Sequence, residues 1–162
     1  MSNYLTDTKN ANVLVPAKSS TLTLADVVAR VESNNNKYAM RFEPAWKVGQ
    51  SMINQVASLN KCDTATAQIV CKTSFGAYQI MGSNLYYLGL TQPIGAFMND
   101  PAMQQMFFVA FVRSRMIDFE LDDVLDDDEK GRMFALHYNG NPAAYLVALR
   151  DAYDRMQESI ES

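Results

Sequence analysis

Residues 74–82 read Ser-Phe-Gly-Ala-Tyr-Gln-Ile-Met-Gly, and this stretch decides how the rest of the chain is interpreted. Two shorter segments accompany it in a fixed order along the chain, Glu32-Ser33 before it and Tyr138-Asn139-Gly140 after it. Each segment alone occurs by chance in many proteins of this size. The ordered set is far more specific, so it carries most of the argument from sequence.

The composition describes an ordinary globular chain. Of its 162 residues, 48% are apolar and 20% are charged, which suits one domain with one core. The net charge is −4, with a single histidine. Because no cluster of Lys and Arg can neutralise a run of phosphates, we expect no nucleic-acid partner. The same balance offers no polybasic attachment to an anionic surface.

The N-terminal residues 1–20 are rich in Asn, Ser, Thr and Lys, and they predict a polar arm in front of one domain over residues 21–162. The arm lacks a basic start followed by an apolar stretch, so we expect no Sec signal peptide. The longest strongly apolar run, residues 106–112, is too short to span a membrane.

Helical patterns dominate the chain. Thr23 and Asp26 form a capping-box-like pair before residues 24–33, whose apolar positions recur with helical spacing. Further helices are expected over residues 45–59, 83–89, 91–98, 101–117 and 126–138, and from Asn141-Pro142 onward. The helix over 101–117 should be the central buried one.

Residues 38–43 form the one stretch with the alternation of a strand. Tyr38, Met40 and Phe42 would lie on one side, with charged residues on the other. The strand follows Glu32 by a few residues. The predicted fold class is therefore mainly α, a helical globule with one small β element near that acid.

Cys62 and Cys71 leave two arrangements open. Residues 63–72 read as a short helix with Asp63 or Thr64 as N-cap, and such a helix separates its ends by roughly 13 Å. A disulfide needs Cα atoms within about 7 Å. The helix and the disulfide exclude each other unless Cys62 lies on a loop that folds back.

The three segments together resemble the lysozyme-like glycan-cleaving enzymes: lytic transglycosylases, goose-type lysozymes and, most closely, the phage-type N-acetylmuramidases. The resemblance runs from about Leu24 to Tyr153. It implies an α+β lysozyme-like fold and cleavage of the β-1,4 bond between N-acetylmuramic acid and N-acetylglucosamine in peptidoglycan. It implies no cofactor. The implied partners are peptidoglycan glycan strands, with other phage virion proteins as a further candidate.

The resemblance also implies roles for individual residues. Glu32 is the catalytic acid, the Tyr138 hydroxyl approaches it, Gln79 hydrogen-bonds the sugar, and Gly76 lets the glycan approach the backbone. The other residues implied to bind substrate are Ser33, Ser74, Phe75, Tyr78, Met81 and Asn139. The simpler readings are a buried helix start over 76–81 and a helix C-cap over 138–140.

Glu32 also fits this role on physical grounds. It lies at the margin of an apolar stripe, in the last turn of the first predicted helix. Partial desolvation and the negative end of the helix dipole both favour a protonated carboxyl, which a general acid needs near neutral pH. The alternative is an exposed glutamate without a catalytic role.

Hydrolysis usually needs a second carboxylate, as nucleophile or as base for water. Glu43 is the first candidate, because it matches an acid in the strand of the phage muramidases; Asp63 is a weaker one. A salt bridge is the alternative role for Glu43. Without a second acid, the transglycosylase route remains, in which a hydroxyl of the sugar attacks.

No metal site is predicted. The acidic run at 122–129 lacks the ligand spacing of an EF-hand, and acids at a helix start are favoured by the dipole. The expected setting is a phage virion enzyme or an endolysin, held in the virion or host cytoplasm before it acts on the wall. A non-catalytic virion protein with this fold is the competing class.

Overall fold

The computed structural model describes residues 22–115 and 120–162, so the predicted arm over 1–20 lies outside the described residues. The N-terminal half contains α1 (Leu24–Ser33), β1 (Met40–Phe42), α2 (Gln50–Asn60), α3 (Thr64–Cys71), β2 (Thr73–Phe75), β3 (Ile80–Met81) and α4 (Gly82–Tyr87). The C-terminal half contains α5 (Ile94–Asn99), α6 (Pro101–Arg115), α7 (Leu121–Asp126), α8 (Asp128–Tyr138) and α9 (Pro142–Glu161). The predicted mainly α fold with a small β element is confirmed.

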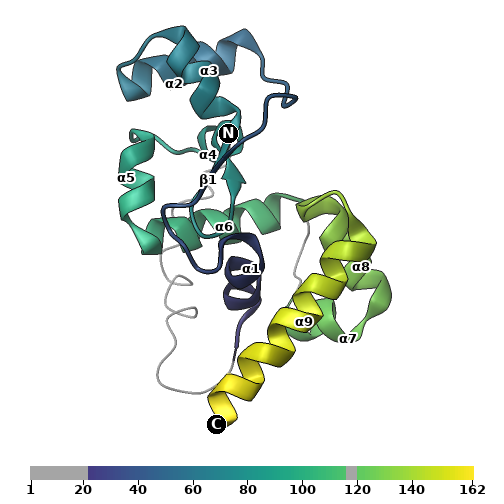
Figure 1. Ribbon diagram of the computed structural model, residues 1–162. Coiled ribbons are helices and arrows are strands. Elements are labelled where there is room, and N and C mark those ends of the chain that lie inside the picture. The colour runs from purple at the N-terminus through teal and green to yellow at the C-terminus, as the bar shows by residue number, and fades with distance from the viewer. Residues whose placement is uncertain (1–21, 116–119) are drawn as a thin grey trace.

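The elements gather into two groups on either side of α6 (Figure 1). One group holds the small sheet with α2 to α5, in which α2 packs against α3 and α3 against α4. The other holds α1 and α7 to α9, in which α9 packs against both α1 and α8. Within the described residues, no helix has the length and apolar character needed to cross a membrane.

Helix α1 has the predicted bounds, because its ends are specified locally. The Asp26 side chain accepts from the backbone N–H of Thr23 at 2.9 Å, and the Thr23 hydroxyl oxygen accepts from Asp26 N–H at 3.3 Å. Asn34 ends the helix in the left-handed region, with φ +56°. The apolar side of α1 is buried, which leaves Glu32 at its margin, half-buried.

The sheet is larger than the single strand predicted for residues 38–43. Its order is β1-β2-β3, antiparallel throughout, with β1 at an edge. Strands β2 and β3 form a hairpin whose turn spans Gly76 to Gln79, closed by a bond from Gln79 N–H to the Gly76 carbonyl at 3.2 Å. The reading of residues 76–81 as a helix start is therefore wrong.

Some helix bounds differ from the sequence-based expectation. Helix α2 starts at Gln50 rather than at 45, α4 starts one residue early, and α5 starts at Ile94. The helix predicted over 126–138 is α8, which starts two residues later because Asp127 is its N-cap and accepts from two backbone N–H groups, while α7 was not predicted. The predicted end of α6 at 117 lies outside the described residues.

The two cysteines are free, and the helical alternative holds between them. Asp63 caps α3 by accepting from Thr66 N–H at 2.8 Å. Cys71 is buried, which raises the pKa of its thiol to about 11, with a smaller contribution from nearby Cys62.

Candidate active site

Glu32 sits in the last turn of α1, where one of its carboxyl oxygens, Oε1, accepts a hydrogen bond from the Tyr145 hydroxyl at 2.7 Å. Burial raises the pKa of Glu32 above its ordinary value. The hydrogen bonds from Tyr145 and Asn139 and the positive charge of Arg41 act in the opposite direction but do not cancel the burial. The surroundings of Glu32 therefore favour the protonated carboxyl, as expected from the sequence.

Tyr145 is the functional candidate that sequence reasoning missed. Helical spacing puts it on the inner face of the last helix with Leu149, Ala152 and Met156, as a packing residue, and it is indeed buried in α9. Because α9 packs against α1, the Tyr145 hydroxyl lies within hydrogen-bond distance of Glu32, which is 113 residues away in sequence. One signal in the sequence could have indicated this contact: a tyrosine stands among the apolar inner-face positions of the helix. A buried tyrosine hydroxyl usually has a hydrogen-bond partner.

Tyr138 makes a different contact from the one expected. Its hydroxyl donates to the Tyr78 backbone carbonyl at 2.7 Å, so the direct bond to Glu32 belongs to Tyr145. The Tyr138 ring stacks on Phe134 at 5.4 Å and on Tyr145 at 5.9 Å. Burial raises the pKa of Tyr138 well above its ordinary value, and the nearby charge of Glu32 adds to this. Tyr138 thus packs against Tyr145, the residue that bonds to Glu32, and holds the turn at Tyr78.

The turn over residues 76–79 is fastened to the helix that carries Glu32. The Ser33 hydroxyl donates to the Ala77 carbonyl at 2.8 Å. Gln79 accepts from the Ser74 hydroxyl at 2.9 Å and donates to the Gly76 carbonyl at 3.0 Å. Both ends of the Gln79 amide, expected to bind sugar, therefore hold the turn in its shape.

Packing explains why residue 76 is a glycine. Its φ is +78°, and a Cβ there would lie 2.6 Å from Oε1 of the buried Gln104 side chain. Gln104 accepts from Ala77 N–H at 2.9 Å and donates to the carbonyls of Lys37 and Met98 at 3.0 and 3.2 Å. This corrects the expectation that the missing side chain makes room for the glycan: it makes room for Gln104.

Three other residues expected to bind substrate are closed off from solvent. Ser74 is 1% exposed and Phe75 and Tyr78 are also buried, with Tyr78 stacked on Phe108 at 4.5 Å. They form the support of the turn rather than a sugar-binding wall, which corrects their predicted role. Of the remaining predicted contacts, Asn139 is exposed and Met81 is half-buried, so both are accessible.

Glu43 lies just after β1 and forms an ion pair with Arg41, whose Nε is 2.6 Å from its Oε1. Arg41 is also close enough to Glu32 to lower the pKa of that carboxyl. Arg41 therefore connects the two acids electrostatically. Asp63, the weaker candidate, is occupied as the N-cap of α3.

Metal binding finds no support in the described part of the chain, where no group of three or more His, Cys, Asp or Glu side chains could hold an ion. The acidic run at the α7–α8 junction is used in capping and in ion pairs. Asp123 pairs with Lys130 at 2.5 Å, and Asp128 pairs with Arg150 at 2.7 Å.

Comparison with known proteins agrees with this geometry. The family model described as N-acetylmuramidase matches residues 15–157. A protein named endolysin from Enterobacteria phage PRD1 is 36% identical over 128 residues, which cover 73% of this chain and 86% of that relative. No solved structure matches the chain. The chain belongs to the N-acetylmuramidase family, whose peptidoglycan-degrading activity the three sequence segments predicted.

Proposed function

We propose that Glu32 is the general acid with which this muramidase hydrolyses the β-1,4 bond between N-acetylmuramic acid and N-acetylglucosamine. The observation that carries the proposal is a half-buried carboxyl of raised pKa that accepts a hydrogen bond from the buried Tyr145 hydroxyl at 2.7 Å. A carboxyl of raised pKa keeps its proton to higher pH and can deliver it to the leaving glycosidic oxygen.

The surroundings of Glu32 suit both protonation states in turn. Before the proton moves, burial favours the neutral acid. After transfer, the carboxylate accepts from the Tyr145 hydroxyl and lies near the positive charge of Arg41, and both interactions stabilise the new negative charge. Tyr145 thus positions the acid and supports its conjugate base.

We assign the second acidic role to Glu43. Its ion pair with Arg41 places it beside the cation that also acts on Glu32. In a hydrolytic reaction it would activate water or attack the sugar, and the carboxyl separation distinguishes the two routes: about 5 Å for retention and about 6.5–9.5 Å for inversion. In the transglycosylase route a hydroxyl of the substrate attacks, and Glu43 is dispensable.

Mass spectrometry of digested peptidoglycan tests this assignment. Wild-type protein should release fragments ending in reducing muramic acid, and Glu43→Gln should be severely impaired. Anhydro-muramic ends, lighter by one water, from the wild-type protein would establish the transglycosylase route instead. If the fragments are hydrolytic but Glu43→Gln is fully active, the second acid lies elsewhere.

The similarity to a phage endolysin supports a role in host lysis rather than in wall opening during DNA entry. The two roles differ in where the protein resides. An endolysin accumulates in the infected cell and is absent from purified particles, whereas a virion enzyme copurifies with them. Quantifying the protein in purified particles against infected-cell extract therefore separates the two roles.

A further inference from the structure

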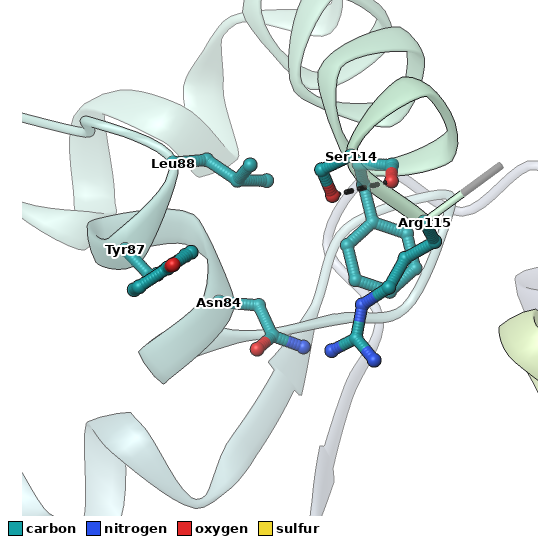
Figure 2. Close-up of a pocket in the computed structure, with 6 residues that line it drawn as sticks. Asn84, Tyr87, Leu88, Ser114 and Arg115 are labelled. Carbon is teal, nitrogen blue, oxygen red and sulfur yellow. Dashed lines mark hydrogen bonds between the residues drawn. The ribbon is translucent and has the colours of Figure 1, made fainter. Parts of the chain in front are cut away.

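A pocket of about 380 Å³ lies between α4 and the end of α6, apart from the residues that surround Glu32. Figure 2 shows it in close-up, with side chains from α4 on one wall and from α6 on the other. The lining residues are Asn84, Tyr87, Leu88, Phe111, Ser114 and Arg115. It therefore lies between α6 and the group of elements that holds the small sheet.

Of the polar side chains that line this pocket, only Ser114 has a hydrogen-bond partner among the described residues, the Phe111 carbonyl at 2.8 Å. The side-chain amide of Asn84, the hydroxyl of Tyr87 and the guanidinium of Arg115 have no hydrogen-bond or ion-pair partner in residues 22–115 and 120–162. In Figure 2 the Asn84 amide and the Arg115 guanidinium point toward each other. Tyr87 is 80% exposed, so its ring and hydroxyl are open to a ligand.

Arg115 gives the pocket its chemical preference. The Arg115 guanidinium lies over the Phe111 ring, 5.4 Å from its centroid, which fixes its stem while its donors face outward. In contrast, Arg41 and Arg150 are already bound to carboxylates. A guanidinium with free donors, next to an amide, matches the two oxygens of a carboxylate.

Three packed aromatic rings separate the pocket from the proposed acid. The Phe111 ring on its wall meets the Tyr138 ring at 5.6 Å, Tyr138 stacks on Tyr145, and Tyr145 holds Glu32. A peptide extends about 3.3 Å per residue, so an extended branch of several residues, attached to the glycan near Glu32, has the length that three packed rings span.

We propose that this pocket binds a free carboxylate of the stem peptide that branches from muramic acid. The inference rests on the proposed function, because it takes the substrate to be peptidoglycan with its peptides in place. N-acetylglucosamine is uncharged and gives Arg115 no counter-ion, whereas stem peptides carry free carboxylates. Peptide-free muramic acid exposes one carboxylate of its own, and the experiment below separates these two sources.

Binding is tested without catalysis by NMR titration of the full chain with a free stem tetrapeptide. The side-chain signals of Asn84 and Arg115 should shift, and Arg115→Gln should weaken binding about tenfold, the scale of one charge-assisted hydrogen bond. Arg113→Gln is the matched control, since Arg113 is exposed on the same helix but does not line the pocket. Equal affinity in both variants, or full affinity for an amidated tetrapeptide, would overturn the proposal.

Activity gives the second test, on strands with their peptides and on strands stripped by an amidase. Arg115→Gln should lose about tenfold in kcat/KM on peptide-bearing strands and nothing on stripped ones, while Arg115→Lys keeps part of the effect. An equal loss on both substrates would mean that Arg115 contacts the sugar or its own carboxylate, and would overturn the stem-peptide assignment. If the wild-type chain is inactive on every wall, the proposed function fails, and the titration still decides the pocket.

Discussion

Glu32 and the turn over residues 76–79 are neighbours joined by Ser33, yet their polar groups are used in opposite ways. In the turn, the Gln79 amide is bonded at both ends within the protein, and Ala77 is held by the buried Gln104. Glu32 is half-buried, and its carboxyl accepts from the Tyr145 hydroxyl at 2.7 Å and from the Asn139 side chain. Neighbouring sequence motifs can thus differ in role, one supporting the fold and the other the proposed chemistry. Substitutions in the turn should lower stability, whereas substitutions of Glu32 should lower activity.

Glu32→Gln should show the largest effect on activity. Glutamine keeps the size and can still accept from Tyr145, but it cannot donate a proton to the glycosidic oxygen. We expect a loss of about 10²–10⁴-fold in turnover of purified peptidoglycan, the usual contribution of a general acid. A variant that retains full turnover would remove Glu32 from the mechanism.

The same variant should be no less stable than the wild type. Burial raises the pKa of Glu32, so the folded state keeps its proton to higher pH than the unfolded state does. Stability is therefore lost as the pH rises from the ordinary pKa through the raised one. Thermal unfolding should therefore give Glu32→Gln a higher melting temperature than the wild type at pH values above the raised pKa. Below the ordinary pKa the two melting temperatures should be the same.

Gly76→Ala should show the largest effect on stability. The new Cβ would adopt a φ of +78° and lie 2.6 Å from Gln104, so we expect a destabilisation of about 2–4 kcal/mol. The control is Gly95→Ala in α5, where the Cβ meets nothing within 4 Å and a helical alanine is favourable. If urea unfolding shows the two variants to be equally stable, the turn is not the rigid support described above.

Gln79→Ala sharpens the comparison further. Since both amide ends hold the turn, the variant should lose about 1–2 kcal/mol of stability. Activity should fall mainly by the unfolded fraction, and recover when the assay temperature is lowered well beneath the melting point. A loss of turnover that persists in fully folded protein would restore the sugar-binding role that the resemblance implied.

The smallest and most specific effects are expected from the two stacked tyrosines. Tyr145→Phe removes the donor to the Glu32 carboxylate, so turnover should fall about tenfold and the alkaline limb of the pH profile should move to higher pH. Tyr138→Phe removes a bond to a backbone carbonyl, and should cost about 1 kcal/mol of stability without moving that limb. If the limb moves in Tyr138→Phe instead, the two roles are exchanged.

Much of the fold could be predicted from sequence because its signals are local. The bounds of α1 follow from Thr23, Asp26 and the asparagines after it, and the start of α9 follows from Asn141-Pro142. Strands β2 and β3 could not be predicted in this way, since they contain three and two residues and are almost wholly buried. Such short buried runs show no alternation.

In the candidate site too, local features could be predicted from sequence and contacts between distant segments could not. The half-buried position of Glu32 could be predicted, because its place at the margin of an apolar stripe is a property of one helix. Its contact with Tyr145 depends on how α1 packs against α9, and the partner of Tyr138 depends on where the turn at Tyr78 lies. Neither contact follows from local residue spacing. The sequence alone therefore could not show which of the two tyrosines, Tyr138 or Tyr145, bonds to Glu32.

The most direct test is an NMR titration of the Glu32 side-chain carboxyl in the wild type and in Tyr145→Phe. The structure predicts that the pKa of Glu32 lies above its ordinary value in the wild type, because burial outweighs the hydrogen bonds and the charge of Arg41. It predicts a further rise in Tyr145→Phe, because a donor to the carboxylate is lost. A wild-type pKa at or below the ordinary value, or no change on removing the Tyr145 hydroxyl, would contradict the account.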